Sequence, residues 1–232
     1  SLIAVTDLAT LVQVWPKAMG TPMNDLVRLF RALASTPRLQ VLRFLTRHSE
    51  CTVGRIADKL SMGLPLVSKH LAALRANGVV ASRRQGRHVF CRLAESEGDA
   101  FLGALLRWLA PLLRAGPEAT LEQVWPASVR AGPSDADLIR ALTAYTYERR
   151  LEMLCVSLQR PQTTVSDWLD ALRMSPQAAR RQTRKLTTRK VLREVQAPSE
   201  SRYQPARAFA ARWEAQLFAM VAGELRRRSG HT

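Results

Sequence analysis

The second half of the chain contains basic side chains spaced to share one face of a helix, a pattern typical of contact with nucleic acid. Ser175 and Pro176 predict a helix start, because a serine hydroxyl caps free backbone N–H groups and proline fits the first helical turn. The outward face of that helix carries Gln177, Arg180, Arg181, Arg184 and Lys185. Glutamine and arginine pair bidentately with adenine and guanine, so we expect Gln177 and Arg181 to meet base edges and Arg184 and Lys185 to meet phosphates. A merely solvated basic helix is the alternative.

A second segment, 64–75, has the same pattern with different chemistry. If its apolar stripe of Val67, Leu71 and Leu74 faces inward, the outward positions are Leu64, Pro65, Ser68, Lys69 and Ala72. These side chains offer few bidentate hydrogen-bonding groups, so base reading through hydrogen bonds is expected to be weak. Leu64 and Pro65 could contact thymine methyl groups or could cover a local core, and the sequence leaves both alternatives open.

A basic β-hairpin is predicted after each of these helices. In the first, alternating residues from Val79 to Leu93 flank a turn at Gly86. The arginines that suit phosphate or minor-groove contacts are Arg83, Arg84 and Arg87 in the first hairpin and Arg193 and Arg202 in the second. We favour Arg87 and Arg202, which are expected at matching places in the hairpin turns, and we expect some of the others to be solvated.

The similarity between the two regions extends along the chain. Gln13-Val-Trp-Pro16 returns as Gln123-Val-Trp-Pro126, and from Asp25 to Met62 a shift of 112 residues gives 12 identities in 38 positions without a gap. Composition alone would give roughly three. The sequence therefore predicts an internal duplication, with one domain at 1–116 and a second at 117–232.

Each copy reads as a mainly helical domain with a small β-hairpin wing. In the first copy we expect helices near 26–33, from Pro37, from Thr52 to Leu60 and from Pro65, a left-handed cap at Asn77-Gly78, the hairpin, and a last helix over 99–114. Additional short helices are expected near the N-terminus and in the linker. This order predicts two tandem winged helix-turn-helix domains, in which a short helical core presents one helix to a major groove.

The second copy departs from the first in its hairpin region. Arg189-Lys190 replace Asn77-Gly78, and the residues 197–201 predict a wing longer by about three residues. Pro205 is expected to interrupt the returning strand, so the second wing should be looser.

The stretch from Leu26 to Leu93 resembles the ArsR/SmtB-type bacterial repressors. The resemblance rests on Arg31-Ala-Leu33, Thr36-Pro-Arg-Leu39, Val67-Ser-Lys-His-Leu71 with Leu74-Arg75, and Gly78-Val-Val80 with the wing residues 83–90. It implies a DNA-binding transcriptional regulator, usually a repressor that blocks polymerase by occupancy. His70 falls at a structural position of the family's recognition helix.

The resemblance also implies a pair of DNA-binding domains, because family members act as homodimers built on their first and last helices. Two copies in one chain can supply both halves, so we favour a monomeric pseudodimer on an imperfect inverted repeat, with Trp15, Trp108, Trp125 and Trp213 at or near the internal interface. A true dimer with four winged helices remains open.

Composition agrees with a double-stranded DNA partner and excludes several other classes. The 232 residues carry 35 Lys and Arg against 19 acids, and both halves are basic. No apolar run of membrane-spanning length, signal sequence or disulfide framework is seen, so we expect a cytoplasmic protein without a membrane partner. No phosphate loop or nucleophile with a matched base is present, which argues against an enzyme and against a cofactor.

Metal and redox sensing are weakly supported. The segment Glu50–Gly54 lacks the paired cysteines, and 99–114 lacks the histidines, through which family members bind metals, so no metal site is predicted. A redox role for Cys51 and Cys91 is left open, although isolated buried cysteines are the ordinary interpretation.

Two other classes of function stay as alternatives. Tandem winged helices also occur in plasmid or phage replication initiators and in other DNA-organising proteins. They can also dock protein partners, in which case the basic faces would be solvated.

Overall fold

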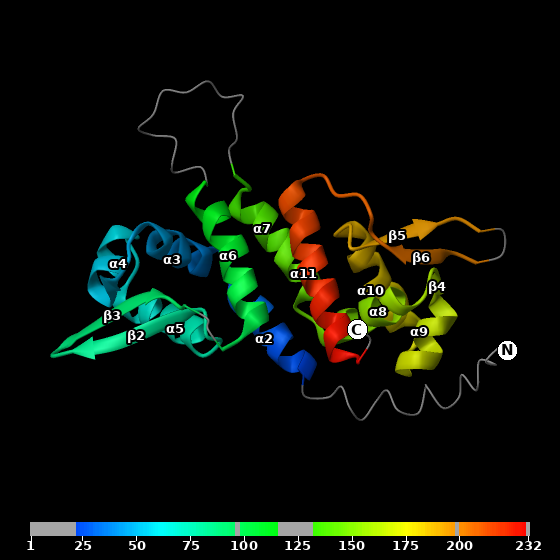
Figure 1. Cartoon of the computed structure of the whole chain (residues 1–232), viewed down its shortest axis with the longest axis horizontal. Helices are drawn as coiled ribbons and strands as arrows, with labels where there is room; N and C mark the ends of the chain where they lie inside the picture. Colours follow the sequence, from blue (N-terminus) through cyan, green and yellow to red (C-terminus); the bar gives the residue numbers. More distant parts are fainter. Residues whose placement is uncertain (1–21, 96–97, 116–131, 198–199, 231–232) are drawn as a thin grey trace, which may run out of the picture. The chain divides into compact units, whose positions relative to one another are not determined.

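The computed structural model describes residues 22–95, 98–115, 132–197 and 200–230. Within these ranges the chain is mainly helical with two small antiparallel sheets (Figure 1). The elements are α2 (Pro22–Leu33), α3 (Thr36–Arg47), β1 (Cys51–Thr52), α4 (Val53–Lys59), α5 (Leu64–Arg75), β2 (Val80–Gln85), β3 (His88–Leu93), α6 (Ala100–Arg114), α7 (Asp135–Leu142), a 3-10 turn (Thr143–Tyr145), α8 (Glu148–Gln159), β4 (Thr163–Thr164), α9 (Val165–Leu172), α10 (Pro176–Thr188), β5 (Leu192–Val195), β6 (Arg202–Pro205) and α11 (Arg212–Arg228). None of the described helices is long and apolar enough to cross a membrane.

The elements divide into two compact units. The α5 unit comprises the described parts of 28–143 together with 211–220, and the α10 unit comprises the described parts of 1–27, 144–210 and 221–232. Each unit therefore takes helical segments from both halves of the sequence. The predicted linker helix and most of the N-terminal segment, including Trp15 and Trp125, lie outside the described residues.

The α5 unit has a tri-helical core that fixes α5. Leu39, Leu42, Ile56, Val67 and Leu74 are fully buried, which confirms the predicted inward placement of Val67 and Leu74. Thr52 begins α4 by accepting a hydrogen bond from the Arg55 amide at 3.3 Å. Burial of these apolar side chains leaves the opposite face of α5 in solvent.

The chain reverses after α5 through a glycine that no other residue can replace without strain. Gly78 has φ +69°, and a Cβ there would lie 2.9 Å from the side chain of Leu102. The predicted left-handed cap is thus confirmed. The following hairpin, β2 and β3, turns at Gly86 with φ +58° and pairs with the short β1 in the order β1-β3-β2.

The C-terminal ends of α3 and α6 are joined by two arginines. The buried Arg43 donates through Nη1 to the Leu113 carbonyl at 2.5 Å and through Nη2 to the Asp135 carboxylate at the start of α7. Arg114 donates in return to the Thr46 carbonyl at 3.0 Å. These bonds satisfy carbonyls that have no partner within their own helices.

Trp108 and Trp213 are neighbours inside the α5 unit, although they come from opposite halves of the sequence. The indole Nε1 of Trp108 donates to the Trp213 carbonyl at 3.1 Å, and the ring centroids lie 6.4 Å apart. Trp108 is buried and Trp213 is half-buried.

The order of elements around α5 occurs a second time around α10. The sheet order is β4-β6-β5, and α8, β4, α9, α10, β5 and α11 each begin 112 residues after α3, β1, α4, α5, β2 and α6. Residues with a left-handed backbone conformation also recur after 112 residues: Ser61 (φ +51°) corresponds to Arg173 (φ +48°), and Gly78 corresponds to Lys190 (φ +56°). Lys190 therefore occupies a conformation that favours glycine.

Strand pairing corrects two expectations for the second wing. Val80 pairs with Leu93 and Leu192 with Pro205, so both hairpins enclose the same number of residues and the predicted three-residue growth is wrong. The second wing instead loses ladder pairs near its tip: its pairing ends at Val195 and Arg202. Pro205 stands at the end of β6 and terminates that strand, because proline lacks the N–H that a ladder needs.

The second correction concerns Arg202. It pairs with Thr164 as Phe90 pairs with Thr52, so it matches Phe90 and not Arg87. Arg202 and Arg87 therefore do not occupy equivalent places in the two wings.

Candidate nucleic-acid interface

The outward face of α5 is exposed at each position that the sequence predicted. Leu64, Pro65, Ser68 and Lys69 all face solvent, and Leu64 is 53% exposed. A side chain that covered a local core would be largely buried, so Leu64 does not serve that purpose. Leu66, which the amphipathic pattern does not mark as a contact residue, is 46% exposed and extends the apolar surface across the first turn of the helix.

A groove joins this first turn to the wing. It runs between α4, α5 and the hairpin tip and is lined by Thr52, Val53, Gly54, Arg55, Asp58, Lys59, Leu64, Ser68, Arg87, His88 and Val89. Leu64 and Ser68 thus share a surface with the exposed Arg87. Arg55 and Lys59 add two cations from α4, against the single acid Asp58, so the groove favours a polyanion.

Arg83 is held by groups of the protein itself. Its Nε donates to Glu50 at 2.8 Å, with a second bond from Nη2, and Nη1 donates to Gln85 at 2.8 Å. The guanidinium carbon also lies 4.7 Å from the centre of the Phe90 ring. The hydrogen bond from Arg83 lowers the pKa of Glu50 and raises the pKa of Arg83 itself. Arg83 therefore stiffens the wing, and a phosphate would have to compete with Glu50 for it.

The other predicted wing arginines are exposed. Arg84 donates through Nε to the Gly86 carbonyl at 3.1 Å, across the hairpin turn. In the second wing, Arg193 donates to Gln204 and Arg202 donates to Gln162 at 3.0 Å. Hydrogen bonds to neutral amides leave the positive charge uncompensated, so these groups keep their attraction for phosphate.

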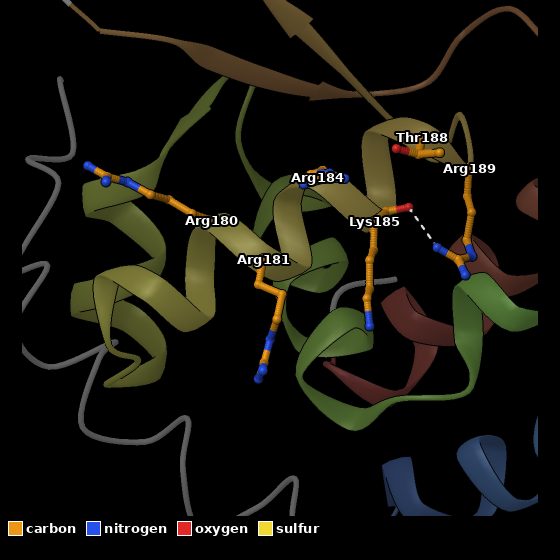
Figure 2. A pocket seen from close by; sticks show the side chains of 6 residues that line it. All are labelled: Arg180, Arg181, Arg184, Lys185, Thr188 and Arg189. Atoms are coloured by element: carbon orange, nitrogen blue, oxygen red, sulfur yellow. Dashed lines mark hydrogen bonds between the residues drawn. The ribbon is translucent and has the colours of Figure 1, made fainter.

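The outward face of α10, together with Arg189 directly after the helix, carries a basic stripe, which we define as Arg180, Arg181, Arg184, Lys185, Thr188 and Arg189 (Figure 2). Ser175 caps the helix by accepting from the Ala178 amide at 3.3 Å, as predicted. The opposite face, with Ala179, Gln182, Thr183 and Leu186, is buried.

Four cations of the basic stripe have side chains without a partner among the described residues. For Arg180, Arg181, Arg184 and Lys185, the side chains form no hydrogen bond or ion pair with the other described residues, and all four are exposed. Gln177 is exposed in the first turn of the same helix. Unpaired, exposed cations on one helix face are suited to phosphates and base edges.

One acidic side chain lies beside the stripe. Glu194 on β5 lines a small concavity together with Arg180, Arg184 and Tyr203. Burial and the Glu194 charge both raise the pKa of the Tyr203 hydroxyl, with burial the larger cause. Ser82 occupies the equivalent position in the first wing, so this negative charge is specific to the second.

His70 lies on the inner side of α5. Its Nε2 is buried without a hydrogen-bond partner in the described structure. Burial lowers the pKa of the imidazole, and the nearby Arg38 and Lys69 add to that effect. Arg38 itself donates to the Ala32 and Arg31 carbonyls at the end of α2, at 2.5 and 2.6 Å.

The cysteines are buried thiols. Cys51 and Cys91 are direct partners across β1 and β3, a proximity that the sequence did not predict. Burial raises the pKa of both thiols, and raises that of Cys155 to about 11, which disfavours the reactive thiolate. The described residues contain no group of histidine, cysteine or carboxylate side chains that could hold a metal ion.

An exposed recognition helix over a tri-helical core, followed by a basic hairpin, defines a winged helix-turn-helix of the DNA-binding class. The family model "Bacterial regulatory protein, arsR family" matches residues 36–82, from the start of α3 into β2.

Sequence similarity to two relatives supports the same assignment. The transcriptional activator HlyU of Vibrio cholerae is 34% identical over 101 residues, which are 40% of this chain and 93% of HlyU. The HTH-type transcriptional repressor SmtB of Mycobacterium tuberculosis is 43% identical over 67 residues, 29% of this chain and 49% of that relative. A solved structure of reduced HlyU from V. cholerae has 31% identity and a TM-score of 0.32, and the match covers 38% of this chain and 88% of that one. The chain belongs to the ArsR family of bacterial regulatory proteins, and is a DNA-binding transcriptional regulator of that family.

Proposed function

We propose that this chain is a sequence-specific regulator that binds double-stranded DNA as a fused pseudodimer, on an imperfect inverted repeat. The observation that carries the proposal is the recurrence of six element starts at one shift of 112 residues, with an exposed recognition helix in each set. A homodimeric regulator needs two such helices about 34 Å apart, one DNA turn. One duplicated chain contains both.

The composition of the compact units supports a fused dimer further. The α5 unit includes α7 and the first half of α11, which belong to the second sequence copy, while the first residues of α2 belong to the α10 unit. Exchange of first and last helices between copies is the arrangement expected of an interface built on those helices. We place the boundary between the copies at residue 116, with domains at 1–116 and 117–232.

Regulation by this protein is proposed to be repression through occupancy of a promoter. The repressor SmtB among its relatives agrees with this proposal, whereas HlyU, another relative, is an activator.

Selection of bound duplexes from a random pool, followed by genomic footprinting, tests the proposal. We expect one motif with two unequal half-sites about one helical turn apart, located at promoters. Repeated sites at a replication origin would favour an initiator instead. If no motif is recovered and binding does not weaken as the salt concentration rises, the basic faces do not serve to bind DNA.

A further inference from the structure

The two recognition helices present opposite chemistry at equivalent positions. In the first turn, Leu64, Pro65 and Leu66 of α5 correspond to Pro176, Gln177 and Ala178 of α10. Further along, Ser68, Lys69 and Ala72 correspond to Arg180, Arg181 and Arg184. At these positions the first helix therefore has an apolar tip, formed by Leu64, Pro65 and Leu66, and a single cation, Lys69, while the second has a polar tip and the basic stripe.

We propose that α5 reads the 5-methyl groups of thymines in one half-site, whereas α10 reads guanine edges and phosphates in the other. This inference rests on the proposed function and specifies what each half-site contains. Thymine methyls are the only apolar groups on the base edges of the major groove, and small apolar side chains discriminate by contact with them.

The surroundings of Leu64 favour DNA as the partner of the apolar tip. Leu64 lines the same groove as Arg55, Lys59 and Arg87, so an occupant of the groove meets an apolar side chain among three cations and one acid, Asp58. A duplex satisfies both requirements, since its phosphates flank a groove floor that carries methyl groups. An apolar protein partner would leave those cations without counter-charges.

Arginine chemistry explains the other half-site. Arg181 lies in the second turn of α10, is exposed, and is joined in one stripe to Arg180 and Arg184 (Figure 2). A guanidinium fits the O6 and N7 acceptors of guanine, and its neighbours can reach the flanking phosphates.

Replacement of thymine by uracil tests the first half of the inference, because it removes the methyl group and nothing else. In the selected duplex, we expect substitution in one half-site to weaken wild-type binding about fourfold per contacted methyl, and substitution in the other to have no effect. With Leu64→Ala combined with Leu66→Ala, the thymine and uracil duplexes should bind equally. Both leucines are exposed, so the melting temperature of the variant should match that of wild type.

A matched control comes from the same groove. Lys59→Ala should weaken binding to both duplexes by one factor and preserve the uracil effect, because lysine meets phosphate and not the methyl group. In the second half-site, 7-deazaguanine removes one guanine acceptor. This substitution should weaken DNA binding by the wild type roughly tenfold and leave DNA binding by the Arg181→Ala variant unchanged.

The inference is overturned if neither half-site responds to uracil, or if the double leucine variant keeps the full uracil effect. It is equally overturned if Arg181→Ala remains sensitive to 7-deazaguanine. Failure to select any duplex would contradict the proposed function instead, so the two failures are distinguishable.

Discussion

Removing two charges from the basic stripe of α10 should change how DNA binding depends on salt. The side chains of Arg184 and Lys185 are exposed and have no hydrogen-bond or ion-pair partner among the described residues, so in the free protein they contribute little besides charge. Each phosphate contact contributes about 0.9 to the slope of log K against log salt. Arg184→Ala with Lys185→Ala should therefore reduce the slope by about 1.8. If both proteins bind alike near 1 M salt, that difference amounts to roughly 30-fold in affinity at 0.15 M.

Fluorescence anisotropy with a labelled duplex from about 0.1 to 0.4 M salt measures the slope directly. Arg107→Ala is a suitable control, since it removes an exposed cation of α6 that lines neither the groove beside α5 nor the basic stripe, and it should leave the slope unchanged. The same loss should occur on specific and random duplexes, because phosphate contacts carry no sequence information. A slope reduced by less than about 0.5, or reduced as much by the control, would refute a phosphate role for the stripe.

Three further predictions follow from individual side chains. Arg43→Ala should lower the free energy of unfolding by about 2 to 3 kcal/mol in urea titrations, because it leaves the partly exposed Asp135 carboxylate and the Leu113 carbonyl without a donor. An unchanged unfolding midpoint would mean that these two contacts do not stabilise the fold. Glu194→Ser, which copies the first wing, should strengthen DNA binding roughly two- to fivefold by removing a charge that repels phosphate, and weaker binding would assign Glu194 a contact of its own. Burial holds the His70 pKa below its ordinary 6.5, so the folded state should be fully stable above that pH and should lose stability as the pH falls. The urea midpoints at pH 7.5 and pH 5.5 should therefore differ less in His70→Gln than in the wild type. The same difference in both proteins would mean that another group causes the pH dependence.

The helical framework could be predicted because its signals are local. The apolar spacing of Val67, Leu71 and Leu74, the Ser175-Pro176 start and Gly78 each depend on neighbours within a few residues, and the structure has the helices and turns they predict. The family assignment also rested on such local runs. The expected helix from Pro37 begins one residue earlier, at Thr36.

Partners brought together by strand register could not be predicted in the same way. The contacts of Arg83 with Glu50 and of Cys51 with Cys91 connect residues more than 30 positions apart. Arg202 was wrongly predicted to match Arg87 because the sequence suggested an insertion in the second wing. The two wings have the same length, and the second only has fewer paired residues near its tip. Register depends on the whole ladder, so a short alternating run leaves it open.

Leu66 was missed for a different reason. An apolar residue at the start of a helix is ordinarily assigned to the core, and the amphipathic pattern alone gave no reason to place it outside. Its exposed fraction of 46%, beside the exposed Leu64, is the signal that separates a reading surface from a core position.

The central claim is that one chain contains both halves of a DNA-binding dimer with unequal halves. The mass of the complex with its selected duplex, measured by sedimentation or native mass spectrometry, tests it most directly. We predict one chain of 25.9 kDa per duplex, protecting two half-sites of different sequence. Two chains on a duplex with one perfectly symmetric repeat would contradict the account.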